Sequence, residues 1–91
     1  MKVAVHYQAQ LRTAAGRAST SVELPAGATL TDLIGKLVQE HDDGFRRILL
    51  DDAGRLRSSI LLFVGDEQCR GQARPLRDGD VVTLLAPMAG G

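Results

Sequence analysis

The segment ATLTDLIGKLVQEHDDG, residues 28–44, decides the fold class, because the apolar pattern changes there to the period of a helix. Its apolar residues recur at the spacing i, i+3, i+4, i+7 and i+8 and form one stripe: Leu30, Leu33, Ile34, Leu37 and Val38. Thr29 and Asp32 resemble a capping box, with Asp in place of the usual Glu or Gln. Gly44 suits the position just after a helix, and Gly35 costs about 1 kcal/mol relative to Ala unless it permits a close approach to a sheet. The segment predicts one main amphipathic helix.

Two segments before this helix have the period of strands. KVAVHY (2–7) and STSVELP (19–25) both alternate between apolar and polar residues, and Pro25 ends the second. Residues 8–18 lose the alternation, which predicts a turn or a short helix between them. We therefore expect an antiparallel pair whose inward residues are Val3, Val5, Tyr7, Val22 and Leu24.

The second half of the chain predicts further strands. A short helix is expected over 45–50, and the run from Ile60 to Val64 is apolar on both faces, which favours the centre of a sheet or an interface. After a turn in RPLRDGD (74–80), residues 81–86 form the last strand. We expect the first and last strands to lie side by side in the centre. The fold class is therefore α+β, with one main helix packed on a small mixed sheet.

Composition excludes several classes of function. A chain of 91 residues is expected to form one domain. Lys and Arg total 11, as do Asp and Glu, so the chain lacks the basic excess typical of nucleic-acid binding. No apolar run has the length of a membrane span, and the N-terminus lacks a signal-peptide pattern, so we expect a cytoplasmic protein that binds no membrane. The single cysteine, Cys69, excludes an intrachain disulfide framework.

The last eight residues, LLAPMAGG, raise the question of function. Glycine has no Cβ, so a Gly-Gly end can thread a channel that is too narrow for other residues. The only functional group of Gly91 is its carboxylate, which reacts as an acyl donor once it has been activated as an acyl phosphate or an acyl-adenylate. Attack by sulfur then gives a thiocarboxylate, and attack by an amine gives an amide. Either reaction makes the chain a carrier or substrate, and the catalytic groups belong to another protein.

The segment PLRDGDVVTLLAPMAGG (75–91) resembles the C-terminus of the MoaD/ThiS family of ubiquitin-like sulfur carriers. The resemblance rests on the turn Leu76-Arg77-Asp78-Gly79-Asp80, the apolar last strand and the pair Gly90-Gly91. The opening VHYQAQLRTAAG and the helix entry PAGATLTDLIGKL are also similar to that family. This resemblance implies a ubiquitin-like β-grasp domain over residues 1–87 and a flexible tail over 88–91.

The family resemblance also implies a function. An activating enzyme, similar to the ubiquitin-activating adenylyltransferases, uses ATP to adenylate Gly91, and sulfur transfer gives a thiocarboxylate. The carrier itself is not an enzyme and binds no cofactor. A synthase then accepts the sulfur, and the Pro-x-x-Gly-Gly ending from Pro87 favours the molybdopterin branch, whose acceptor is the large synthase subunit. FVGDEQCRG (63–71) is closer to the cysteine branch, and the thiamine and secondary-metabolite branches stay open, as do a ubiquitin-like modifier and an interaction module with an inert tail.

Partner contacts are expected on the sheet face that the main helix leaves open and on the tail. Leu61, Phe63 and one of Leu84 or Leu85 are expected to contribute apolar surface on that face, whereas Gly90 serves the threading of the tail. The predicted interface residues are Leu61, Phe63, Leu84, Leu85, Pro87 and Met88.

Other polar residues carry weaker hypotheses. Cys69 is either a sulfur-relay thiol or, as the favoured interpretation, a hairpin residue without a chemical role. His6 and His41 are far apart in sequence and have no second metal ligand nearby. Three late arginines, Arg70, Arg74 and Arg77, either contact acidic groups of a partner or form a solvated face.

Overall fold

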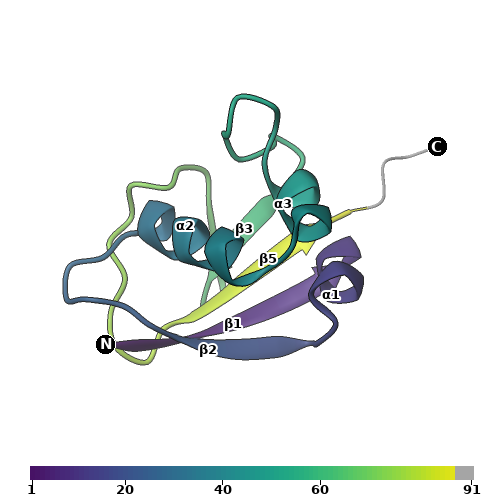
Figure 1. Cartoon of the computed structure of the whole chain (residues 1–91). Coiled ribbons are helices and arrows are strands. Elements are labelled where there is room, and N and C mark those ends of the chain that lie inside the picture. The colour runs from purple at the N-terminus through teal and green to yellow at the C-terminus, as the bar shows by residue number, and fades with distance from the viewer. Residues whose placement is uncertain (88–91) are drawn as a thin grey trace.

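The computed structural model describes residues 1–87, which form a mixed five-stranded sheet crossed on one face by a helix (Figure 1). The strands are β1 (Lys2–Ala9), β2 (Ser19–Glu23), β3 (Leu61–Val64), β4 (Glu67–Cys69) and β5 (Val81–Ala86). Their order is β2-β1-β5-β3-β4, in which β1 and β5 are parallel and the other pairs are antiparallel. The α+β prediction and the central pairing of the first and last strands are confirmed.

The main helix, α2 (Leu30–Glu40), begins at the predicted capping box. The Asp32 backbone N–H donates to Thr29 Oγ1 at 3.4 Å, and the Thr29 N–H donates to Asp32 Oδ2 at 2.9 Å. The predicted stripe is buried apart from Val38, which is half-buried. A Cβ on Gly35 would meet open space, so that glycine does not serve a close approach to the sheet.

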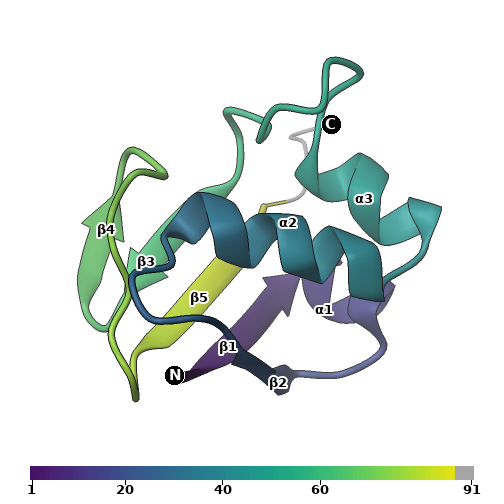
Figure 2. The ribbon, with the colours of Figure 1, turned by 60° about the vertical axis from the view of Figure 1, so that its left-hand side comes forward.

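The core lies between α2 and one face of the sheet (Figure 2). Because strand residues alternate between faces, every second side chain of the central strands points to the helix. These inward side chains are all buried: Val3, Val5, Tyr7, Leu62, Val64, Val82 and Leu84.

The aromatic group at the end of α2 ties the helix to β1. His41, the C-cap of α2, stacks on Phe45 with ring centroids 4.1 Å apart, and its Nε2 lies 3.0 Å from the Tyr7 hydroxyl oxygen. Burial is the main cause that raises the pKa of Tyr7 to about 12, and Glu40 adds to it, while Arg17 opposes it. The hydroxyl therefore stays protonated at neutral pH.

Two short helices complete the fold, α1 (Gln10–Ala15) and α3 (Asp43–Leu49). The α3 helix begins before the predicted 45–50, because the Asp42 side chain caps it by accepting from the Phe45 N–H at 3.1 Å. Gly44 consequently lies inside α3, and the expectation that it follows the C-terminus of α2 is wrong. In Figure 1, α1 and α3 lie at the end of the sheet where β5 finishes.

Candidate functional site

The site expected from the sequence begins where β5 leaves the sheet. β5 pairs with β1 on one side and with β3 on the other, and Ala86 is its last residue, opposite Ala9. Pro87 follows, exposed, as the last described residue. The predictions for Met88, Gly90 and Gly91 lie outside the described residues. The described part of the chain therefore supplies a doubly paired base for whatever follows Pro87.

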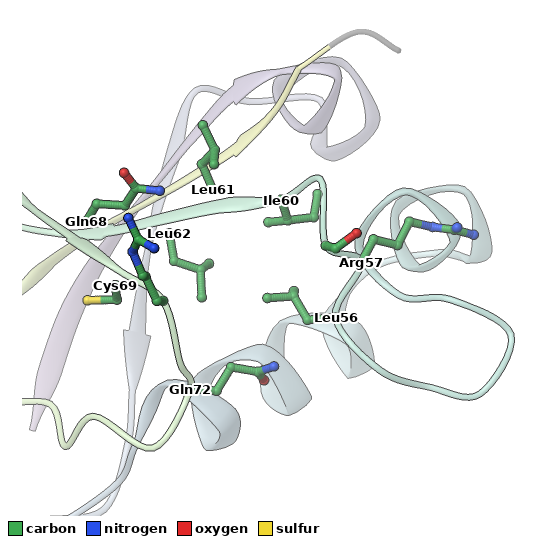
Figure 3. A pocket seen from close by; sticks show the side chains of 10 residues that line it. Leu56, Arg57, Ile60, Leu61, Leu62, Gln68, Cys69 and Gln72 are labelled. Atoms are coloured by element: carbon green, nitrogen blue, oxygen red, sulfur yellow. The ribbon is translucent and has the colours of Figure 1, made fainter.

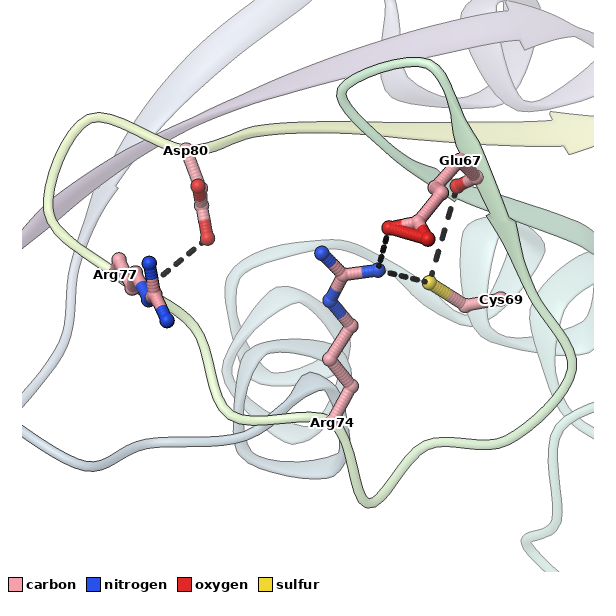
Figure 4. A network of polar contacts seen from close by, with 5 residues as sticks. All are labelled: Glu67, Cys69, Arg74, Arg77 and Asp80. Carbon is pink, nitrogen blue, oxygen red and sulfur yellow. Dashed lines mark hydrogen bonds and ion pairs between the residues drawn. The ribbon is translucent and has the colours of Figure 1, made fainter.

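The turn before β5 fixes the other end of that strand. Asp78 Oδ1 accepts a hydrogen bond from the Lys2 backbone N–H at 2.7 Å, and the Gly79 N–H donates to the Lys2 carbonyl at 2.8 Å. Gly79 has φ 87°, a conformation that favours glycine. Asp80 Oδ2 accepts from the Arg77 N–H at 2.8 Å, as Figure 4 shows. The residues that carry the family resemblance thus attach the start of β5 to the start of β1.

The sheet face that points away from α2 carries an apolar surface, here called the open face. Its residues come from β3 and β5 and are Leu61, Phe63, Val81, Thr83 and Leu85. Leu61 is opposite Leu85 and Phe63 is opposite Thr83, so these side chains form adjacent cross-strand rows. Val81 is the most exposed of the large apolar residues in the described part of the chain, at 39%.

The predicted interface is wrong at Leu84, which does not lie on the open face. It pairs with Leu62, belongs to the inward face and is 0% exposed. Leu85, the next residue, is half-buried on the open face. The run VVTLL is apolar enough on both sides that either leucine could have faced the helix, and the pairing with β3 decides in favour of Leu84. The structure therefore brings together Leu61, Phe63 and Leu85, with Pro87 at the strand end.

Cys69 lies at the edge of the sheet in a small polar network (Figure 4). Arg74 Nη1 is 3.0 Å from Glu67 Oε1 and 3.5 Å from Cys69 Sγ. The hydrogen bond to Glu67, followed by the one to Cys69, raises the pKa of Arg74 above its ordinary value. Because β3 separates β4 from β5, the thiol is two strands away from the strand that leads to Pro87.

The two histidines occupy unrelated places. His6 is exposed on β1, as expected. His41 is hydrogen-bonded to the Tyr7 hydroxyl and stacked on the Phe45 ring. Among residues 1–87, no three His, Cys, Asp or Glu side chains are grouped so that they could hold a metal ion. None of the helices in this part of the chain is both long and apolar enough to cross a membrane.

Comparison with known proteins assigns the family. A scan against protein-family models matches the ThiS family over residues 5–91. The chain belongs to the ThiS family. The match spans nearly the whole sequence, and it agrees with the resemblance drawn from the turn and the last strand. A search of proteins with curated descriptions finds no match.

Solved structures related to this ThiS-family chain share its whole fold. The structure of the Amycolatopsis orientalis BexX/CysO complex matches at 32% identity, covering 98% of this chain and 99% of that chain, with a TM-score of 0.70. A putative molybdopterin converting factor subunit 1 from Pyrococcus furiosus matches at 30% identity, covering 97% and 99%, with a TM-score of 0.77. SAMP1 from Haloferax volcanii matches at 24% identity over 100% of both chains, with a TM-score of 0.91, which shows the ubiquitin-like β-grasp fold.

One feature of this ThiS-family chain was missed by sequence reasoning. A depression of about 560 Å³ lies beside the end of β5, between α1 and α3, and Ala9, Thr13, Ala14 and Ile48 are among its lining residues. Ala9 has a backbone φ of 58°, and residues other than glycine rarely adopt a positive φ. An alanine gives no signal of this conformation in a sequence, so the sharp junction between β1 and α1 was not predictable.

Proposed function

We propose that this ThiS-family chain is a sulfur carrier whose Gly91 carboxylate is adenylated and then converted to a thiocarboxylate. The chain is a co-substrate of partner enzymes and has no catalytic group of its own. One observation carries the proposal: β5, paired on both sides, leads through Pro87 toward Gly91, and the family match extends to that residue. A carrier needs a rigid base for the segment that enters an activating enzyme.

The chemistry has two steps. First, a carboxylate oxygen of Gly91 attacks the α-phosphorus of ATP, and pyrophosphate leaves to give an acyl-adenylate. Second, hydrosulfide attacks the carbonyl carbon, the bond to the AMP oxygen breaks, and AMP leaves. The product carries sulfur in place of one carboxylate oxygen. Gly90 contributes by its shape, because a side chain there would widen the segment that threads the activating site.

The open face is the proposed docking surface for the partner enzymes. The chain leaves one end of this apolar surface in the direction of Gly91. A partner that binds the tail can therefore cover the surface at the same time. Leu61, Phe63 and Leu85 supply the apolar contact, and Pro87 and Met88 are proposed as further contacts when the tail is bound. The related BexX/CysO structure is that of a complex, which supports a protein as the kind of partner.

The proposed sulfur acceptor is an enzyme of molybdopterin synthesis, of the type of the large molybdopterin synthase subunit. The 30% identity to a putative molybdopterin converting factor subunit 1 supports this branch, as does the Pro87 ending. A second candidate is cysteine synthesis, favoured by the 32% identity to the BexX/CysO structure and by residues 63–71. Incubating the thiocarboxylated chain with each acceptor enzyme and its small-molecule substrate in turn discriminates between them, because only the true acceptor consumes the thiocarboxylate at Gly91 at a catalytic rate.

Intact-protein mass spectrometry tests the carrier proposal directly. After incubation with ATP, an activating enzyme and a sulfur donor, the expected product has exchanged one oxygen for one sulfur at Gly91. Deletion of Gly91 displaces the carboxylate by up to about 3.6 Å, and because a misplacement of about 1 Å can cost a hundredfold in rate, this variant is expected to be almost inert. Gly90→Val retains the carboxylate and is expected to fail at binding of the tail.

Sulfuration of the Gly91 deletion at the full-length rate would overturn the proposal. Isopeptide-linked adducts to lysine, without any thiocarboxylate intermediate, would identify a protein modifier instead. Both variants should keep the melting temperature of the full chain, since a glycine has no side chain that a core could bury, and this provides the control for folding.

A further inference from the structure

A groove beside the edge of β3 shares Leu61 with the open face but is otherwise not used in the function proposed above. It has a volume of about 510 Å³ and lies between the segment 56–62 and the segment 68–72 (Figure 3). Leu56, Ile60 and Leu62 form its apolar floor, and Figure 3 shows their side chains grouped on its inner side. This volume is within the range of ligand-binding clefts.

The backbone at this groove is partly open. β4 ends at Cys69, which is opposite Leu62, so β4 pairs with β3 no further toward its start. Leu61 is paired with Leu85 of β5 on one side, and within residues 1–87 no strand pairs with it on the other side. An unpaired strand edge is a template for an extended chain that adds itself to the sheet.

The charges at the groove have one sign. Arg57 and Arg70 line it and are exposed, and no Asp or Glu is among its lining residues. In the described part of the chain neither arginine belongs to an ion pair, whereas Arg74 is paired with Glu67. Arg57 lies at one end, where its Nε donates to the Arg47 carbonyl at 2.8 Å, so that its guanidinium points away from the groove toward α3 (Figure 3), and Arg70 follows Cys69 at the other end. Among the lining residues, the charge available to a ligand is therefore that of Arg70, although the whole chain has no net charge.

We propose that this groove binds an extended acidic segment of a partner protein, with an apolar side chain over Ile60 and Leu62 and a carboxylate near Arg70. The apolar floor supplies contact area, Leu61 is the one residue of β3 that residues 1–87 leave open for backbone pairing, and Arg70 selects for negative charge. Leu61 belongs to both the groove and the open face, so a partner that covers one surface reaches the other. The inference does not depend on any reaction at Gly91.

The test uses the full-length, ¹⁵N-labelled chain and a blocked peptide, acetyl-Glu-Asp-Leu-Asp-Glu-amide, followed by NMR at low salt. Saturable shift changes are expected at the amides of residues 56–62 and 68–72. Arg70→Glu should weaken binding at least about tenfold, because it replaces an attraction to the acidic peptide by a repulsion that low salt screens only in part. The matched control is Arg12→Glu, which makes the same charge change at an exposed position of α1 and should leave binding unchanged.

Three results would overturn the proposal. The first is the absence of saturable shifts at millimolar peptide, and the second is equal weakening by Arg12→Glu. The third is equal binding of a peptide with Lys in place of each acid, or of tripolyphosphate, which would show an apolar contact or a bare anion site. No ATP, activating enzyme or sulfur donor is present, so failure here leaves the carrier proposal to its own test.

Discussion

The two faces of the sheet are built by the same strands and have opposite tasks. Leu84 and Leu85 are neighbours in β5, yet Leu84 is fully buried beneath α2 and Leu85 is half-buried on the open face. Val82 and Val81 repeat the contrast nearer the start of β5, where their exposed fractions are 0% and 39%. Chemically identical residues therefore serve the core or the surface according to their phase in the strand.

This contrast separates stability from recognition. The inward face is covered by the stripe of α2, so changes there remove packing that holds the fold together. The open face keeps apolar residues that the fold does not fully bury, which is the pattern of a surface reserved for a partner. A chain of this size can therefore change its partner surface at little cost to its core.

The largest difference is expected between the two adjacent leucines. Leu84→Ala leaves a cavity in the core and should lower the free energy of unfolding by about 2–5 kcal/mol. Leu85→Ala removes a half-buried side chain and should lower it by about 1 kcal/mol or less. Denaturant titration of both variants measures this. Equal losses would mean that the two faces do not differ in the way that the structure indicates.

The next largest effect is a loss of stability at alkaline pH, and it arises from Tyr7 on the inward face. The pKa of Tyr7 is raised from 10.0 to about 12 in the folded chain, so the unfolded chain loses this proton first as the pH rises. Stability from this group is present below pH 10 and is lost as the pH approaches 12, by up to about 2–3 kcal/mol for a shift of this size.

The Tyr7→Phe variant is the control for that loss. It should be less stable at neutral pH by about 1 kcal/mol, because His41 Nε2 loses its partner. It should also show a shallower decline of unfolding free energy across the alkaline window. A decline as steep as that of the parent chain would assign the alkaline loss to other groups.

A smaller effect is expected at the capping box, which starts the helix that covers the inward face. Thr29→Ala removes the acceptor for the Asp32 N–H and should cost about 1 kcal/mol. Thr13→Ala, an exposed change within α1, is the matched control and should stay within about 0.5 kcal/mol. Thermal unfolding of the two variants tests the difference, which vanishes if the cap contributes nothing.

The smallest effect on folding is expected on the open face. Val81→Thr keeps the shape of an exposed side chain and should change the unfolding free energy by no more than about 0.5 kcal/mol. The same change at buried Val82 places a hydroxyl in the core and should cost about 1–3 kcal/mol. Binding to an activating enzyme should show the reverse order once both variants are folded. Stronger destabilisation by Val81→Thr would contradict the assignment of the two faces.

The sequence by itself determined the features that depend on near neighbours. The stripe of α2 and its Thr29–Asp32 cap follow from spacing. The strands over 2–7 and 19–25 follow from alternation, and the strand over 81–86 follows from its apolar run between the turn at 74–80 and Pro87. The turn at Asp78-Gly79 was also readable, because glycine and aspartate have local conformational preferences. These features fixed the fold class and, through the resemblance they carried, the family.

Only the tertiary structure decided the features that depend on pairing between distant segments. The VVTLL run is apolar in both phases, so the sequence could not assign Leu84 to the core, and the register with β3 did so. The early start of α3, the positive φ of Ala9 and the groove beside β3 likewise arise where separate segments meet. The physical reason is that periodicity shows which residues share a face, whereas burial is set by what the rest of the chain places against that face.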